Sequence, residues 1–127
     1  MKVKSFCFDD LQTTVSEYVR ERDWEKYHNA KDVATSIAIE SAELLELFQW
    51  KKSPEHGENI SDELRKRIGE ELADVIIYCA CLANSTSIDL SFALRDKLEK
   101  NKRRYPVEKV LKAASWDEVA NLKNSEK

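Results

Sequence analysis

Four carboxylates interrupt two apolar helical patterns in this chain. Glu40 and Glu43 lie in one of these stretches, and Glu71 and Asp74 repeat the arrangement in the other. Because residues three apart share a helical face, two such helices packed together would bring all four carboxylates to one place. Their mutual repulsion would be costly unless a cation lay between them. The pattern predicts a site for a hard divalent cation such as Mg²⁺, which prefers oxygen ligands.

The spacing of three alone is a weak signal. The chain holds 24 acidic residues, and other pairs such as Asp96 and Glu99 share the spacing. Solvent accommodates such pairs on a charged helix face without a metal. Solvated helix edges and a polar interface between subunits are therefore alternative interpretations of the four carboxylates.

A nucleotide is a natural partner of carboxylate-held Mg²⁺, because its phosphate oxygens complete the coordination. The only glycines, Gly57 and Gly69, cannot form a glycine-rich phosphate loop. Trp24 and Trp50 flank the first acidic helix and offer flat faces for a base, although packing or rim positions explain them equally well. Cationic and polar side chains would then hold the phosphates, with these candidates: Lys31, Lys97, Asn101 and Arg104.

The elements that carry these residues are predicted to be helices. A chain of 127 residues suits one domain, and only 2 Gly and 2 Pro argue against an all-β fold. The first helix has Leu11, Val15, Tyr18 and Val19 on its apolar side. Apolar spacing predicts helices over residues 10–21, 33–51, 61–83 and 90–105, with an ordered connection at 22–32 and a possible short helix starting near SWDE (115–118).

Composition narrows the classes of function. A net charge of −3 gives no electrostatic case for a nucleic-acid polymer as partner. We expect no membrane span and a cytoplasmic location, because no apolar run is long enough and the start lacks a signal-peptide core. Cys7, Cys79 and Cys81 are interpreted as buried reduced thiols, with a metal site or a disulfide as the alternative.

Several segments resemble one known family. They are the two acidic pairs together with RDWEKYH (22–28), ELLELFQWK (43–51), EELADVIIY (70–78), IDL (88–90) and KLEKNKRRYPVE (97–108). In order and spacing they resemble the MazG-like, all-α nucleoside triphosphate pyrophosphohydrolases, and within these the dCTP pyrophosphatase branch. The similarity covers roughly residues 8–108, so we expect a MazG-like domain over 1–108 and a C-terminal tail over 109–127.

The resemblance implies an enzyme of nucleotide metabolism that hydrolyses a nucleoside triphosphate to the monophosphate and pyrophosphate. The expected substrate is dCTP or modified dCTP. It implies that Glu40, Glu43, Glu71 and Asp74 form the catalytic, Mg²⁺-binding set. It leaves open which of these, or of Glu46 and Glu70, accepts the proton of the attacking water. Another base preference, dUTP-like or purine, and a non-enzymatic helical interaction module are the alternatives.

The same resemblance assigns the substrate contacts. Trp24 and Trp50 would line the base pocket, and Tyr78 would lie beside the sugar or base. His28 fits the aromatic connection of the family, either as a ligand contact or through a structural hydrogen bond. The first helix lacks the His found in some members and has Thr14 and Val15 instead, which bears on base preference. The triphosphate or sugar would be reached by Lys97, Asn101, Arg104 and Tyr105.

The resemblance also implies assembly. Members are dimers or tetramers whose four-helix bundles are built across subunits. Neighbouring apolar residues such as Ile37 with Ile39, and Ile76 with Ile77, place apolar surface on more than one side of a helix. We therefore expect a homodimer or homotetramer in which oligomerisation completes a four-helix bundle.

Overall fold

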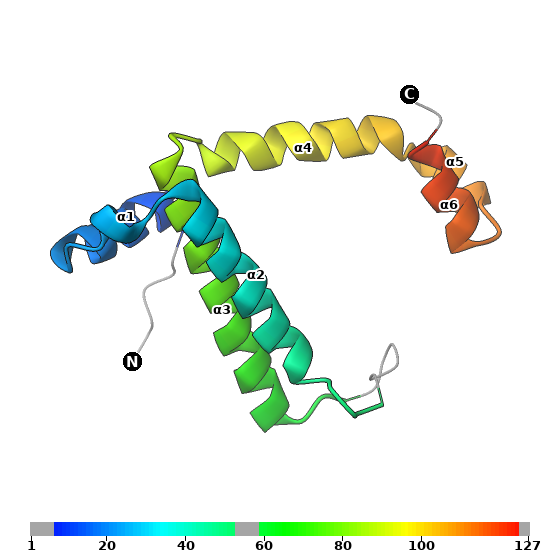
Figure 1. Cartoon of the computed structure of the whole chain (residues 1–127). Helices are drawn as coiled ribbons and strands as arrows, with labels where there is room; N and C mark the ends of the chain where they lie inside the picture. Colours follow the sequence, from blue (N-terminus) through cyan, green and yellow to red (C-terminus); the bar gives the residue numbers. More distant parts are fainter. Residues whose placement is uncertain (1–6, 53–58, 125–127) are drawn as a thin grey trace. The chain divides into compact units, whose positions relative to one another are not determined.

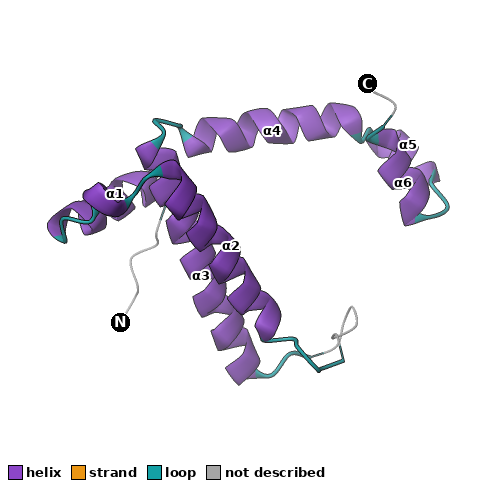
Figure 2. Ribbon diagram, in the orientation of Figure 1, coloured by secondary structure: helices purple, strands orange, loops and turns teal. Residues whose placement is uncertain are grey.

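The computed structural model describes residues 7–52 and 59–124. Helices are the only regular secondary structure in these two ranges, which confirms the predicted all-α class (Figure 2). No single helix within them is long and apolar enough to cross a membrane, whereas the two helices Asp62–Ser85 and Leu90–Arg104 taken together would be, by length and composition only. The chain divides into two compact units, Met1–Asp89 and Leu90–Lys127.

The N-terminal unit is built on a pair of long helices. Helix α2 (Ala30–Glu46) and helix α3 (Asp62–Ser85) run side by side in opposite directions, and α1 (Leu11–Glu21) packs against the C-terminal part of α3 (Figure 1). Short 3₁₀ turns precede α1 at Phe8–Asp10 and α2 at Glu25–Tyr27. The buried apolar core is small: Leu11, Val15, Val19, Val33, Leu47, Ala80, Cys81 and Ala83.

Helix α2 begins three residues earlier and ends five residues earlier than predicted. Its cap is Asn29, whose side-chain oxygen accepts a hydrogen bond from the Asp32 backbone N–H at 2.9 Å. The predicted C-terminal end at Lys51 is wrong because the chain tightens into turns from Leu47 onward and Trp50 adopts a left-handed φ of 62°. Both corrections lie outside the segment that holds the acidic pair.

The start of α3 follows the prediction closely. The Ser61 hydroxyl accepts a hydrogen bond from the Leu64 backbone N–H at 3.2 Å. Asp62 and Glu63 occupy the first turn, where the positive end of the helix dipole favours carboxylates. This cap fixes the register that later places Glu71 opposite α2.

The C-terminal unit contains three helices. Helix α4 (Leu90–Arg104) agrees with the prediction to within one residue. The tail holds two short helices rather than the single one expected, α5 (Val107–Lys112) and α6 (Trp116–Leu122), because Pro106 both ends α4 and starts α5. No residue of these three helices is buried. The predicted domain boundary after residue 108 falls within α5 and stays a prediction.

A pair of amides joins α1 to α3, and its loss is expected to destabilise the unit. Gln12 Nε2 donates to Asn84 Oδ1 at 3.1 Å and to the Ile88 carbonyl at 2.8 Å, while Asn84 Nδ2 donates to the Gln12 carbonyl at 3.0 Å. Asn84→Ala leaves partly buried groups unpaired, which costs about 1–3 kcal/mol. We expect its Tm, measured by circular dichroism, to fall by several degrees, whereas the exposed control Thr13→Ala should leave Tm unchanged. Equal Tm values for the two variants would contradict this role of Asn84.

Candidate metal centre

Three of the four predicted carboxylates converge between α2 and α3. One oxygen each from Glu40, Glu43 and Glu71 lies within 4.8 Å of the others. Glu40 and Glu43 come from one face of α2, and Glu71 lies opposite them on α3. In the part of the chain that the structure describes, this is the only group of three His, Cys, Asp or Glu side chains with such a spacing.

The oxygens of this cluster differ in their surroundings. Glu40 and Glu71 are half-buried, and the Oε2 atom of each is buried without a hydrogen-bond partner. Buried polar atoms almost always have a partner, so two orphaned carboxylate oxygens in one cluster require an explanation. A donor set made only of carboxylates fits a hard divalent cation such as Mg²⁺ or Ca²⁺ rather than zinc, which favours His and Cys.

The pKa values of Glu40 and Glu71 also favour a bound cation in this cluster. A hydrogen bond with Glu43 is the largest cause that raises the pKa of Glu40, followed by burial and by the charges of Glu43, Asp74 and Glu71. Burial is the main cause that raises the pKa of Glu71, and the charges of Glu43 and Asp74 add to it. The folded protein therefore disfavours the charged forms of Glu40 and Glu71, and a bound cation would reverse that preference.

Asp74 lies beside the cluster without belonging to it. It is exposed, and its oxygens are not part of the close group. Its charge nevertheless acts on the pKa of both Glu40 and Glu71, so the fourth predicted carboxylate faces the same side. Tyr78, one turn further along α3, is half-buried.

The two tryptophans lie at opposite ends of α2. Trp24 precedes the helix and is 41% exposed, whereas Trp50 follows it and is 95% exposed. The 17 residues of α2 between them span about 25 Å at a rise of 1.5 Å per residue. The structure of the chain therefore does not bring Trp24 and Trp50 together.

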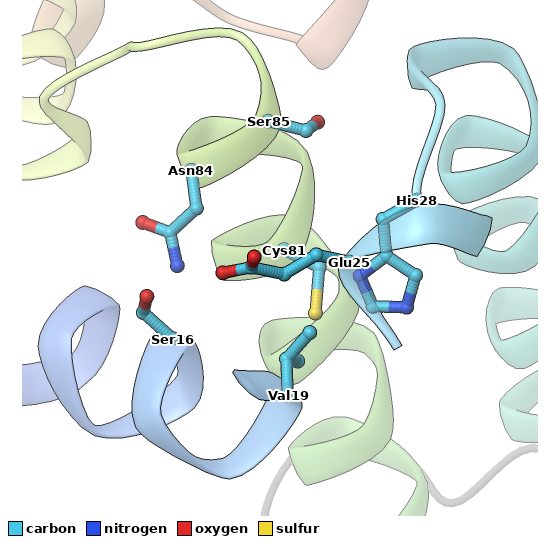
Figure 3. Close-up of a pocket in the computed structure, with 7 residues that line it drawn as sticks. All are labelled: Ser16, Val19, Glu25, His28, Cys81, Asn84 and Ser85. Carbon is cyan, nitrogen blue, oxygen red and sulfur yellow. The ribbon is translucent and has the colours of Figure 1, made fainter. Parts of the chain in front are cut away.

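His28 and Lys31 also lie away from the carboxylates. His28 lines a cavity of about 320 Å³ together with Cys81 and Asn84 of α3, at the level of α1 (Figure 3). Along α3, Cys81 is about 15 Å from Glu71, given the helical rise. Lys31 is exposed and forms an ion pair with Asp32 at 3.2 Å.

The remaining predicted contacts belong to the C-terminal unit. Lys97 is exposed, and Asn101, Arg104 and Tyr105 are half-buried. Steps of four and three residues place Lys97, Asn101 and Arg104 on one face of α4. The Tyr105 backbone N–H, just after the helix, donates to the Asn101 carbonyl at 2.8 Å.

The cysteines do not form a second site. None of the three forms a disulfide. Cys79 is half-buried and Cys81 is buried. Burial raises the pKa of both thiols, which keeps them protonated and unreactive. Cys7 is exposed, so the expectation that all three would be buried is wrong for that residue.

The part of the sequence that holds this acidic cluster matches a known protein family. Residues 35–118, which include both acidic pairs, match the MazG-like family. The chain belongs to the MazG-like family. This confirms the resemblance seen in the sequence. The MazG-like match also covers α4 and α5, so it extends over both units of the chain.

Individual proteins of known name are also similar to this chain. This MazG-like chain is 39% identical to dCTP pyrophosphatase 1 of Homo sapiens over 77% of its length, and 39% identical to that of Bos taurus over 78%. It spans only 58% and 59% of the length of those two relatives. The crystal structure of a pyrophosphatase from Archaeoglobus fulgidus superimposes with a TM-score of 0.66 at 36% identity, covering 84% of this chain and 98% of that one.

Proposed function

We propose that this MazG-like protein hydrolyses the bond between the α- and β-phosphates of a deoxynucleoside triphosphate, with dCTP or modified dCTP as substrate. The products are the monophosphate and pyrophosphate, and the reaction depends on Mg²⁺. The observation that carries the proposal is the convergence of Glu40, Glu43 and Glu71, with two buried oxygens that lack partners. The names of the relatives, dCTP pyrophosphatase 1 and pyrophosphatase, support the reaction and the base.

In this proposal the carboxylates of Glu40, Glu43, Glu71 and Asp74 hold the cation. A bound divalent cation supplies positive charge to phosphate oxygens and acidifies water at the site. Glu40 and Glu71 are anchored on rigid helices, so their oxygens keep their positions without the substrate. The substrate contacts proposed for base, sugar and phosphates are Trp24, His28, Lys31, Trp50, Tyr78, Lys97, Asn101, Arg104 and Tyr105.

The positions of the tryptophans support a site shared between protomers. Trp24 and Trp50 lie at opposite ends of α2, too far apart to contact one base from a single protomer. Apolar side chains of the α2–α3 pair are also exposed, among them Ile39 at 53%, Ile76 at 45% and Ile77 at 37%. We therefore propose a homodimer or homotetramer in which a four-helix bundle forms across subunits. Light scattering coupled to size-exclusion chromatography tests this, since a monomeric mass would contradict it.

The experiment that tests the function is a substrate panel. Purified protein is incubated with individual ribo- and deoxynucleoside triphosphates and Mg²⁺, and pyrophosphate and monophosphate are measured together. We expect equal amounts of the two products, with the fastest release from dCTP or modified dCTP. Faster turnover of dUTP or a purine nucleotide would keep the chemistry and change the base. Absence of turnover across the panel would leave the protein a helical interaction module and refute the enzymatic proposal.

A further inference from the structure

Beside Trp24 lies an arginine that the sequence patterns did not single out. The guanidinium carbon of Arg22 is 3.9 Å from the centroid of the Tyr18 ring and 5.9 Å from that of Trp24. The two rings contact each other edge to face, with centroids 5.8 Å apart and planes at 78°. The three side chains therefore form one packed cluster at the end of α1.

The backbone directs Trp24 into this cluster. Asp23 adopts a left-handed φ of 53°, and the Trp24 N–H donates to the Val19 carbonyl at 3.1 Å, so the chain folds back as it leaves α1. Arg22 is anchored in turn, because its Nη1 donates to the Tyr18 carbonyl at 2.9 Å. Trp24 as a whole residue still remains 41% exposed, so the cluster does not enclose it and a ligand can reach it.

We propose that Arg22 is a positioning residue that holds the Trp24 indole ready to stack on the base of the substrate. The inference rests on the proposed function, in which Trp24 contacts the base. A planar guanidinium can lie flat on Tyr18 and border Trp24 at the same time, which the compact ammonium of lysine cannot do. An indole fixed before binding loses less conformational entropy when the base arrives, so the contribution of Arg22 is to binding.

Arg20 provides a matched control on the same helix end. Its side chain is also exposed and contacts Glu25 at 3.7 Å and the Ser16 hydroxyl at 3.4 Å. The ring contacts found among the described residues involve Arg22 and Lys26 but not Arg20. Replacing Arg20 removes the same charge from the same region without touching the Tyr18–Trp24 pair.

The test is a double-mutant cycle on pyrophosphate release from dCTP. Arg22→Ala and Arg22→Lys are each expected to raise KM about two- to fivefold, the range of an exposed cation–π contact, with little change in kcat. Arg20→Ala should leave both constants unchanged. In a Trp24→Ala background, Arg22→Ala should have no further effect, because its contribution passes through the indole. An unchanged KM in Arg22→Ala, or the same rise in the Trp24→Ala background, would overturn the proposal.

A second readout separates this inference from the proposed function. In a Trp50→Phe, Trp116→Phe background only Trp24 emits, and acrylamide quenching reports how firmly its indole is held. Arg22→Ala should increase the quenching of Trp24 emission whether or not the protein hydrolyses nucleotides, whereas Arg20→Ala should not. Equal quenching in these two variants would overturn the role of Arg22. Absence of turnover in the wild type with increased quenching in Arg22→Ala would instead count against the proposed function alone.

Discussion

Glu71→Gln is expected to lower kcat/KM for the nucleotide by at least about 100-fold, since the loss of a metal ligand costs more than the loss of a supporting group. Glutamine keeps the size of the side chain but removes its charge. It also replaces one carboxylate oxygen with an amide nitrogen, and Glu71 Oε2 is one of the two buried oxygens without a partner. Steady-state measurement of pyrophosphate release over a range of Mg²⁺ concentrations tests this directly.

Measuring the stability of the Glu71→Gln variant distinguishes the loss of a metal ligand from misfolding. The pKa of Glu71 is raised by burial and by the charges of Glu43 and Asp74, so ionised Glu71 destabilises the metal-free protein. The metal-free variant should therefore be at least as stable as the metal-free wild type by thermal unfolding. Glu63→Gln, an exposed carboxylate in the first turn of the same helix, is the control that should keep activity. Full activity of Glu71→Gln would remove Glu71 from the metal centre.

Much of the fold could be predicted because the apolar spacing is clear where the helices pack. Three of the four residues predicted for the apolar side of α1, Leu11, Val15 and Val19, are buried, and α3 begins where the spacing predicted. The start of α2 could not be placed from spacing, since its first residues carry no apolar pattern and the signal was the capping side chain of Asn29. Tyr18 was assigned to the apolar side but is 44% exposed, and its ring packs against the Arg22 guanidinium one turn later rather than in the buried core.

The residues of the candidate site could be predicted from the sequence, but the role of each residue could not. Spacing of three identified both pairs, yet it does not distinguish a metal centre from a solvated edge. The structure shows that each pair has one half-buried member, Glu40 or Glu71, and one exposed member, Glu43 or Asp74. That difference depends on how α2 packs on α3, which no local pattern specifies. The contact of Arg22 with Trp24 likewise depends on the left-handed turn at Asp23, although the Tyr18–Arg22 spacing of four was a visible signal.

Mg²⁺ is expected to activate and stabilise the wild type in a way that depends on pH. At a concentration 100 times the Kd, a ligand adds about 2.7 kcal/mol to the free energy of unfolding, which corresponds to a rise in Tm of several degrees. EDTA should reverse that rise and abolish turnover. Thermal unfolding with and without Mg²⁺, at constant ionic strength, measures the effect, with NaCl as the control for screening.

The direction of the pH dependence follows from the raised pKa values of Glu40 and Glu71. In the metal-free protein, the stability contributed by their protonated forms is complete below the ordinary carboxyl pKa and is lost as pH rises through the raised values. Mg²⁺ must displace these protons, so its affinity should fall as pH is lowered into the weakly acidic range. The rise in Tm should therefore be larger at pH 7.5 than at pH 5, and much smaller in Glu71→Gln at both. An equal rise in wild type and variant would show that Mg²⁺ stabilises the protein elsewhere than between α2 and α3.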